Sequence, residues 1–183
     1  MHLITMAHPG EAQGVIEGLK LKRIDQNTFQ GDGLILLLTG EGPFEAATKT
    51  ALAISRFGIT HVVNLGIAGT LTPDLRIGEL VTVRTIYLIN QGRPDFKTFQ
   101  AATSGVDCLT SFERILKPEK AQKLKGIGHL VDRESWGVAM AAKTAGVTFE
   151  VHKVISDSAG TLEACEIARE NAPIFSHKLF QKL

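Results

Sequence analysis

Three carboxylates, Glu11, Glu134 and Asp157, follow three separate apolar stretches of the chain, and they carry the chemistry that the sequence offers. Splitting a glycosidic bond between ribose and a purine passes through a cation-like sugar, and the departing base needs a proton because its anion is a poor leaving group. Such a reaction needs one acid, one base for the nucleophile and one acceptor for the ribose hydroxyls. Three carboxylates that ring one pocket would supply these groups.

Position alone leaves each acid with a structural alternative. Glu11 falls in the first turn of a predicted helix, where an acid complements the helix dipole. Asp157 follows a predicted strand and could simply cap the helix that comes next. His8 precedes Glu11 in a turn, so it would lie near the same pocket or be merely solvated.

A segment of small residues follows the Val62 strand. Residues 62–71 read Val-Val-Asn-Leu-Gly-Ile-Ala-Gly-Thr-Leu, and Gly66, Ala68 and Gly69 are predicted to form a loop after the strand. Small side chains let backbone N–H groups approach a ligand, and in open α/β sheets ligands sit at the carboxyl ends of strands. The segment therefore predicts either a binding loop or a tight turn.

The elements that must position these residues alternate between strand and helix patterns. Besides the Val62 strand, strands are predicted at residues 3–6, 34–38, 79–89, 127–131 and 147–155. Helices are predicted at residues 11–19, 43–57, 112–124 and 135–145, and from 162 onward with a break at Pro173. Residues 34–65 form a βαβ unit, which makes its two strands parallel. Between 90 and 125, glycines and prolines interrupt the pattern.

The helix at 43–57 has the strongest pattern. Pro43 suits its first turn, and Gly58 suits the position just after its end. Apolar residues recur at helical spacing and predict a stripe that faces the core, formed by Phe44, Ala47, Ala51, Ile54 and Phe57.

Length and composition describe one globular domain over residues 1–183, with 44% hydrophobic and 21% charged residues and a net charge of +1. This balance gives no basic field for nucleic acid or an anionic membrane. Residues 1–6 lack the features of a signal peptide, and no apolar stretch is long enough to span a membrane. Cys108 and Cys165 are too few for a disulfide scaffold or a zinc site, and they predict two buried thiols in a reducing cytoplasm.

Four motifs together resemble, in order, the nucleoside phosphorylase/nucleosidase superfamily. They are Asn-Leu-Gly-Ile-Ala-Gly at 64–69, Gly-Glu-Leu-Val at 78–81, Val-Asp-Arg-Glu-Ser at 131–135 and Ile-Ser-Asp-Ser-Ala at 155–159. Within it, the chain is most similar to methylthioadenosine/S-adenosylhomocysteine nucleosidases and futalosine hydrolases. The resemblance implies a three-layer α/β/α fold around a central mixed, twisted sheet, usually as a homodimer. It also implies a small-molecule nucleoside substrate and no metal or organic cofactor.

Carried over residue by residue, the resemblance implies that Asp157 protonates the purine, that Glu134 binds the ribose hydroxyls and that Glu11 activates water. The same motifs imply substrate contacts at Gly66, Ile67, Ala68, Gly69 and Ser156. Phosphorylases of the superfamily place an arginine for phosphate before the glycine segment, where this chain has Val63 and Asn64. Water is therefore the expected nucleophile.

Two departures from the family pattern stand out. Arg133 replaces the usual methionine beside the ribose, and a guanidinium next to a developing sugar cation is unfavourable unless it is paired or turned away. We expect Arg133 to face the 5′ substituent of the substrate or to be neutralised by Asp132 or another pocket acid, which would favour an anionic substrate. The segment 90–125 is shorter than its counterpart, which supplies an aromatic contact to the base, and Phe112 is the candidate.

These residues favour a nucleoside hydrolase and leave two alternatives open. A protein of the same fold could bind a nucleoside without cleaving it, as Arg133 and the short 90–125 segment would allow. The second alternative is a phosphorylase whose phosphate site the sequence does not reveal.

Overall fold

The chain forms a mixed sheet with helices packed around it, and the computed structural model describes the backbone of residues 1–183 and every side chain except that of Phe96. The strands are β1 His2–Met6, β2 Lys22–Arg23, β3 Thr28–Gly31, β4 Leu34–Leu38, β5 His61–Thr70, β6 Leu80–Asn90, β7 Arg93–Gln100, β8 Val106–Ser111, β9 Leu130–Asp132 and β10 Thr148–Ser158. The helices are α1 Pro9–Gly18, α2 Pro43–Phe57, α3 Pro118–Leu124, α4 Ser135–Thr144, α5 Ala164–Glu170 and α6 Ala172–Phe180. Over the described residues, no helix is both long and apolar enough to cross a membrane.

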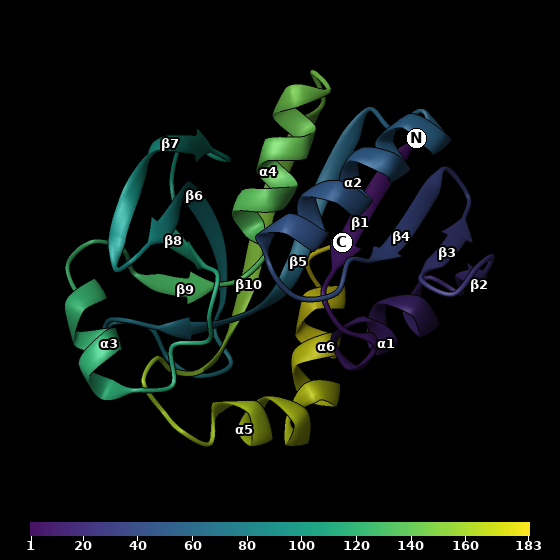
Figure 1. Cartoon of the computed structure of the whole chain (residues 1–183). Helices are drawn as coiled ribbons and strands as arrows, with labels where there is room; N and C mark the ends of the chain where they lie inside the picture. Colours follow the sequence, from purple (N-terminus) through teal and green to yellow (C-terminus); the bar gives the residue numbers. More distant parts are fainter.

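Part of the sheet closes on itself. β5 pairs with β10, β10 with β6, β6 with β8, β8 with β9, and β9 again with β5, so these strands form a ring. From β5 the sheet continues through β1, β4, β3 and β2, while β7 pairs with β6. Figure 1 shows the β6–β9 part on one side of β10 and the β1–β4 part on the other. The predicted mixed sheet is confirmed, and β4 and β5 both run parallel to β1, which lies between them.

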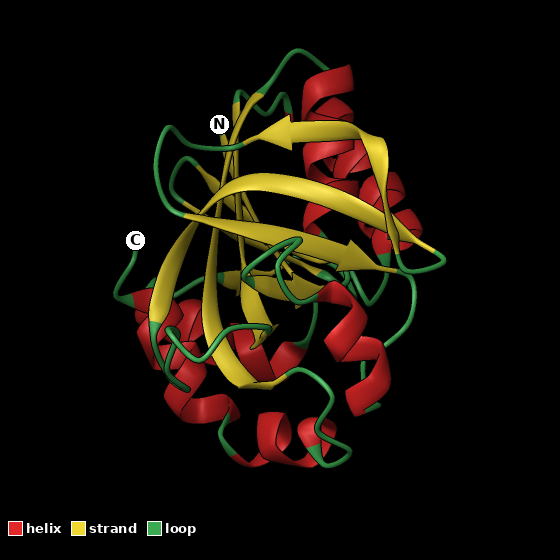
Figure 2. Ribbon diagram, turned by 90° about the vertical axis from the view of Figure 1, so that its left-hand side faces the viewer, coloured by secondary structure: helices red, strands yellow, loops and turns green.

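Helices cover both faces of the parallel strands, as Figure 2 shows. Successive side chains of a strand point to opposite faces, so neighbouring residues enter different core clusters. Leu3, Ile35 and Val62 belong to the cluster with α2 and α4, whereas Ile4, Leu36 and Val63 belong to the cluster with α1 and α6. A third, smaller cluster packs β8 and β9 against α3. The predicted three-layer α/β/α arrangement is therefore confirmed.

Helix α2 has the predicted bounds, but its predicted apolar stripe is only partly right: Ile54 is buried and Phe57 packs against the core, whereas Ala51 is exposed. Phe44 is 72% exposed, and the face that is buried carries Ala46, Thr50, Ala53 and Ile54. The reason is the close approach of α4, where a Cβ at Gly137 would lie 2.1 Å from the Pro43 carbonyl oxygen. Helices this close pack through small residues, so the large Phe44 side chain stays outside.

Two other predictions are corrected by strand pairing. The segment 66–69 is not a loop, because β5 continues through it and pairs with β10 and β9. The segment 90–125 contains the strands β7 and β8, which complete the sheet around β6, and its helix begins only at Pro118. Proline is favoured in the first turn of a helix, so Pro118 starts this helix rather than interrupting it.

Candidate active site

A cavity of about 580 Å³ opens where β1, β9 and β10 end and where the last residues of β5 lie. Strand ends that meet at one edge turn the residues after them toward one space, which is the usual place for a ligand in α/β sheets. The predicted site residues in its wall are Glu11, Ile67, Ala68, Gly69, Arg133, Glu134, Ser156 and Asp157. Residues of α5 and of the start of α6 form part of the opposite wall.

Glu11 lies in the first turn of α1 and is buried. Gly66 of β5 gives it room, since a Cβ there would lie 3.2 Å from Glu11 Oε2 and 3.3 Å from Lys153 Nζ. Burial and the negative charge of Glu134 raise the pKa of Glu11 to about 8, although the charge of Lys153 lowers it. Glu11 therefore holds a proton over much of the neutral pH range.

Glu134 is the last residue before α4, and its carboxylate is also buried. Its Oε1 accepts a 2.9 Å hydrogen bond from the backbone N–H of Gly42, in the loop before α2. Burial and the charge of Asp132 raise its pKa to about 7, whereas Lys153 and the Gly42 hydrogen bond lower it. The cavity thus contains two carboxyl groups that exchange protons near neutral pH.

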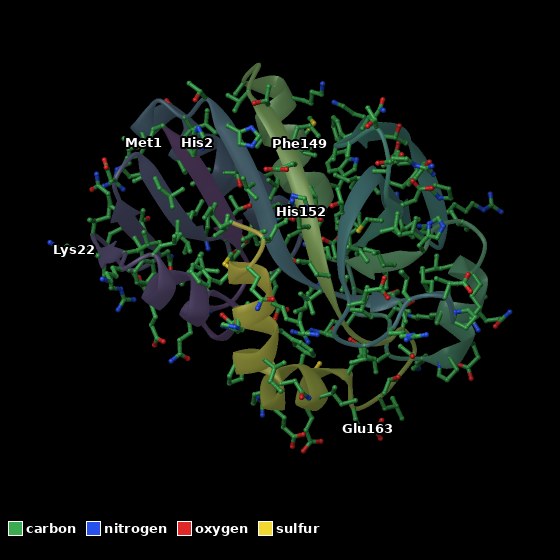
Figure 3. The ribbon with its side chains drawn as sticks, turned by 180° about the vertical axis from the view of Figure 1, so that it is seen from behind. Met1, His2, Lys22, Phe149, His152 and Glu163 are labelled. Atoms are coloured by element: carbon green, nitrogen blue, oxygen red, sulfur yellow. The ribbon has the colours of Figure 1, made fainter. Side chains whose placement is uncertain are left out.

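A buried ion pair joins Lys153 of β10 to Asp132 of β9, with 2.8 Å between Nζ and Oδ2. Asp132 also accepts hydrogen bonds from Thr110 Oγ1, at 2.7 Å, and from Ser135 N, at 3.0 Å. Burial disfavours both charges, but each partner compensates the other, so the pKa of Asp132 is lowered and that of Lys153 is raised. Figure 3 shows β10 from behind, with His152 labelled next to this lysine in the chain. Lys153 therefore stays charged beneath the carboxyl groups of the cavity.

Asp157 lies within β10 and is buried near the end of that strand. Its Oδ1 accepts a 2.5 Å hydrogen bond from Ser156 Oγ, and a Cβ at Gly69 would lie 3.1 Å from its Oδ2. Burial raises the pKa of Asp157 above its usual 3.8, while Ser156 and the charge of Arg114 lower it. The residue that precedes α5 is Glu163, so Asp157 does not cap that helix.

Arg133 is neutralised at the mouth of the cavity by Glu41 rather than by Asp132. Its Nη1 donates to Glu41 Oε2 at 2.5 Å, and Glu41 Oε1 also accepts hydrogen bonds from His8 Nε2 and Arg114 Nη2. Partial burial raises the pKa of Glu41, but the His8 hydrogen bond and the two arginine charges together bring it below its usual value. Glu41 is therefore an ionised carboxylate among three basic side chains.

Two predicted substrate contacts, Gly66 and Phe112, are not part of the cavity wall. Gly66 acts from behind it, by leaving space for the Glu11 side chain. The Phe112 ring packs against Phe44 on the surface, with 5.2 Å between ring centroids, and its carbonyl accepts a hydrogen bond from Arg133. Cys108 is buried as expected, whereas the Cys165 thiol is only half-buried and lies in the cavity wall, which corrects the prediction of two buried thiols.

Three residues of the cavity region were missed by sequence reasoning: Lys153, Glu41 and Arg114. A lysine inside the predicted strand 147–155 was a usable signal, because a charge in a buried strand requires a partner. Glu41 and Arg114 lie in connecting segments with no pattern that marks them. Among the side chains that the structure describes, no group of three or more His, Cys, Asp or Glu residues could hold a metal ion.

The arrangement is suited to proton transfer on an organic ligand. Asp157, with Ser156 beside it, can donate a proton or a hydrogen bond to a ring nitrogen. Glu11 and Glu134 provide a base and a hydrogen-bond acceptor in the same cavity, and Lys153 stabilises their ionised forms.

Comparisons with known proteins agree with this arrangement. The family model described as Phosphorylase superfamily matches residues 23–114. A 5′-methylthioadenosine/S-adenosylhomocysteine nucleosidase from Marinomonas sp. is 40% identical over 53 residues, which are 29% of this chain and 23% of that protein. The matched segment thus spans less than a quarter of this curated relative's length.

Solved structures resemble the whole chain. A futalosine hydrolase mutant of Helicobacter pylori superposes with a TM-score of 0.87 and 16% identity, covering 98% of this chain and 95% of that one. A 5′-methylthioadenosine/S-adenosylhomocysteine nucleosidase from the same organism gives a TM-score of 0.83 and 17% identity, with 98% and 94% covered. At these identities the similarity establishes the fold.

Proposed function

The chain belongs to the phosphorylase superfamily, and from this premise we propose that it is a nucleosidase. Its reaction is the hydrolysis of the N-glycosidic bond of a purine-type nucleoside with a 5′ substituent, which releases the base and a free sugar. The observation that carries this proposal is the convergence of Glu11, Glu134 and Asp157 on one cavity from three separate segments. The named relatives and structural neighbours, which are nucleosidases and a futalosine hydrolase, support it.

Each carboxyl group has a role that fits its surroundings. Asp157 gives a proton to the purine as the bond breaks, and its raised pKa favours the protonated form that this step needs. Glu134 accepts hydrogen bonds from the ribose hydroxyls while Gly42 holds its other side. Glu11 takes a proton from the attacking water in the molecules whose Glu11 carboxyl group is ionised. Its pKa of about 8 makes it a stronger base than an ordinary glutamate, and its ionised fraction grows as pH rises toward 8.

Water, rather than phosphate, is the proposed nucleophile. At the position where phosphorylases of the superfamily are expected to carry a phosphate-binding arginine, this chain has Asn64. That side chain is buried, donates to Thr5 Oγ1 at 3.1 Å and accepts from Ser135 Oγ at 3.1 Å. The Asn64 amide is neutral, and its polar atoms already bond to hydroxyl groups of the chain, so it offers no charge to a phosphate.

The protein is further proposed to be a cytoplasmic homodimer. Phe44 and Leu52 of α2 are 72% and 65% exposed, and Phe112 packs beside Phe44, so an apolar surface borders the cavity mouth. A second copy that covers this surface would remove it from water. The free thiols of Cys108 and Cys165 suit a reducing compartment. Sedimentation of the native protein and of Phe44→Ser tests the dimer, which the substitution should dissociate; a native monomer would refute it.

The test of the activity is a panel of purine nucleosides that differ in their 5′ group, incubated with and without phosphate. We expect free base to appear at the same rate in both conditions, with a free sugar as the second product. A sugar 1-phosphate would identify a phosphorylase instead. Tight binding without base release would identify a binding protein that has lost catalysis, and neither binding nor release would end the proposal.

A further inference from the structure

Three basic side chains from three segments of the chain converge on one point at the cavity mouth. His8 follows β1, Arg114 follows β8 and Arg133 follows β9. All three donate to the carboxylate of Glu41, and all four residues are part of the cavity wall. We call the three donors His8, Arg114 and Arg133 the oxyanion site.

The group that now occupies this site is attached to a short connection between β4 and α2. Glu41 is flanked by Gly40 and Gly42, whose φ values are 76° and 98°. Glycine reaches such values without steric cost, so the connection can change conformation more readily than a strand or helix. The Glu41 side chain is also 28% exposed, so its carboxylate can leave the site without disrupting the core.

Hydrogen bonds within the chain do not use every N–H donor of the oxyanion site. Arg133 Nε is buried and has no hydrogen-bond partner among the described residues. Arg169 adds another positive charge to the same wall, whereas the second acid of this region, Glu113, is paired with Lys120 at 2.6 Å. Without Glu41, the described contacts of the two guanidinium groups are those of Arg133 with the Phe112 carbonyl and of Arg114 with Cys165 Sγ. Both are neutral partners, so the two arginines would lack a paired anion.

We propose that the oxyanion site binds an anionic group carried on the 5′ substituent of the substrate, and that Glu41 occupies the site until that group displaces it. The ligand class is a nucleoside with a 5′ carboxylate, which a guanidinium binds through two parallel hydrogen bonds. The inference rests on the proposed function. The site lies beside the sugar end of the cavity, because Gly42, next to Glu41, holds the carboxylate of Glu134.

Glu41 then competes with the substrate for the same donors. Removing the Glu41 carboxylate therefore raises the affinity of the protein for a substrate with an acidic 5′ substituent. A substrate with a neutral 5′ substituent gains no affinity from this change. Charge-assisted hydrogen bonds are among the strong ones, so we expect the loss of the competing Glu41 carboxylate to raise the affinity for the acidic substrate by about tenfold or more.

The main experiment compares two substrates that differ in one carboxylate, 5′-methylthioadenosine and 5′-deoxy-5′-(carboxymethylthio)adenosine. The measured quantity is the ratio of their kcat/KM values in the native protein, in Glu41→Gln and in Glu45→Gln. Glu45 is the matched control, an exposed acid four residues along that pairs with Lys49. We expect the acidic-to-neutral ratio to rise about tenfold or more in Glu41→Gln and to stay unchanged in Glu45→Gln. An unchanged ratio in Glu41→Gln would overturn the proposal.

A second arm separates this site from the proposed activity and from a phosphate site. Propionate or inorganic phosphate is added to each protein, and the melting temperature reports binding. We expect propionate to stabilise Glu41→Gln more than the native protein, and the effect to vanish in Glu41→Gln/Arg133→Met. If this holds while no nucleoside is cleaved, the proposed function fails and the site stands. If phosphate binds there and speeds base release with a sugar phosphate product, the site serves a co-substrate and the proposal is wrong.

Discussion

At the scale of single residues, the cavity contains carboxyl groups whose burial is energetically unfavourable when they are ionised. Glu11 has a carboxyl group whose pKa of about 8 lies far above its usual 4.5, mainly because burial penalises its charge. Under the proposed function, this residue serves the chemistry at the expense of stability. Its cost appears only when the carboxyl group is ionised, so it depends on pH.

The first prediction is that Glu11→Gln stabilises the protein at alkaline pH. Between pH 4.5 and about 8 the folded state binds more protons than the unfolded state, so this residue makes stability fall as pH rises. Glutamine removes that penalty. Urea unfolding should show a variant close to the native protein at pH 5 and more stable by up to about 5 kcal/mol at pH 9, at about 1.4 kcal/mol per pKa unit.

The control for this measurement is Glu17→Gln, an exposed acid on the same helix. It should show no such divergence between pH 5 and pH 9. A Glu11→Gln variant that is equally or less stable than the native protein at pH 9 would show that the carboxylate of Glu11 is well accommodated.

The second prediction is that Asp157→Asn lowers turnover by about a hundredfold or more while the fold survives. Asparagine keeps an oxygen for the Ser156 hydroxyl but has no proton to give to the base. Asp157 caps no helix, so the melting temperature should change little. Base release and thermal unfolding measured on the same sample test both parts, and a variant that fails to fold would point to a structural role.

At the scale of elements, sequence periodicity predicted most strands and helices, and tertiary packing decided the rest. The strand at 34–38 and the helix at 43–57 have the predicted bounds because their signals are local: an apolar run, Pro43 and Gly58. The segment 66–69 was misassigned because glycine in a strand marks the close approach of another group, here the Glu11 and Lys153 side chains. No local signal reports such a neighbour.

The inward face of α2 shows the same limit. Periodicity selected the face of Phe44, but the tight contact with Gly137 of α4 requires small residues on the buried side. A second copy of the chain is the proposed partner of the face that remains outside. Hydrophobic spacing cannot distinguish a face that packs within the chain from one that packs between chains.

The third prediction tests this helix contact through Gly137→Ala. Alanine normally favours a helix by about 1 kcal/mol over glycine, but here its Cβ would meet the Pro43 carbonyl oxygen at 2.1 Å. The helices must move apart, so we expect the free energy of unfolding to fall by about 2 kcal/mol or more. Gly10→Ala in α1 is the control, because its nearest atom is Ala172 Cβ at an ordinary 3.5 Å. Equal stability of the two variants would contradict the tight α2–α4 contact.

At the scale of the whole molecule, the closed ring of strands brings the site together. The three carboxylates could be predicted to share a pocket because each follows the end of a predicted strand, and strand ends meet at one edge. Lys153 could not be placed in this way, since its partner Asp132 comes from β9 and the two meet only in the closed ring. Gly66 makes room for the lysine, whose Nζ lies against β5.

The last prediction concerns this buried pair and the stability of the whole chain. Lys153→Met leaves the carboxylate of Asp132 buried without its counter-charge, which typically costs about 3–5 kcal/mol. Lys153→Met/Asp132→Asn removes the stranded charge and keeps an oxygen for Thr110 and Ser135, so it should recover much of the loss. Urea unfolding of both variants, with the exposed Lys143→Met as control, measures the recovery. If the double variant is no more stable than Lys153→Met, the lysine acts through its packing and not through its charge.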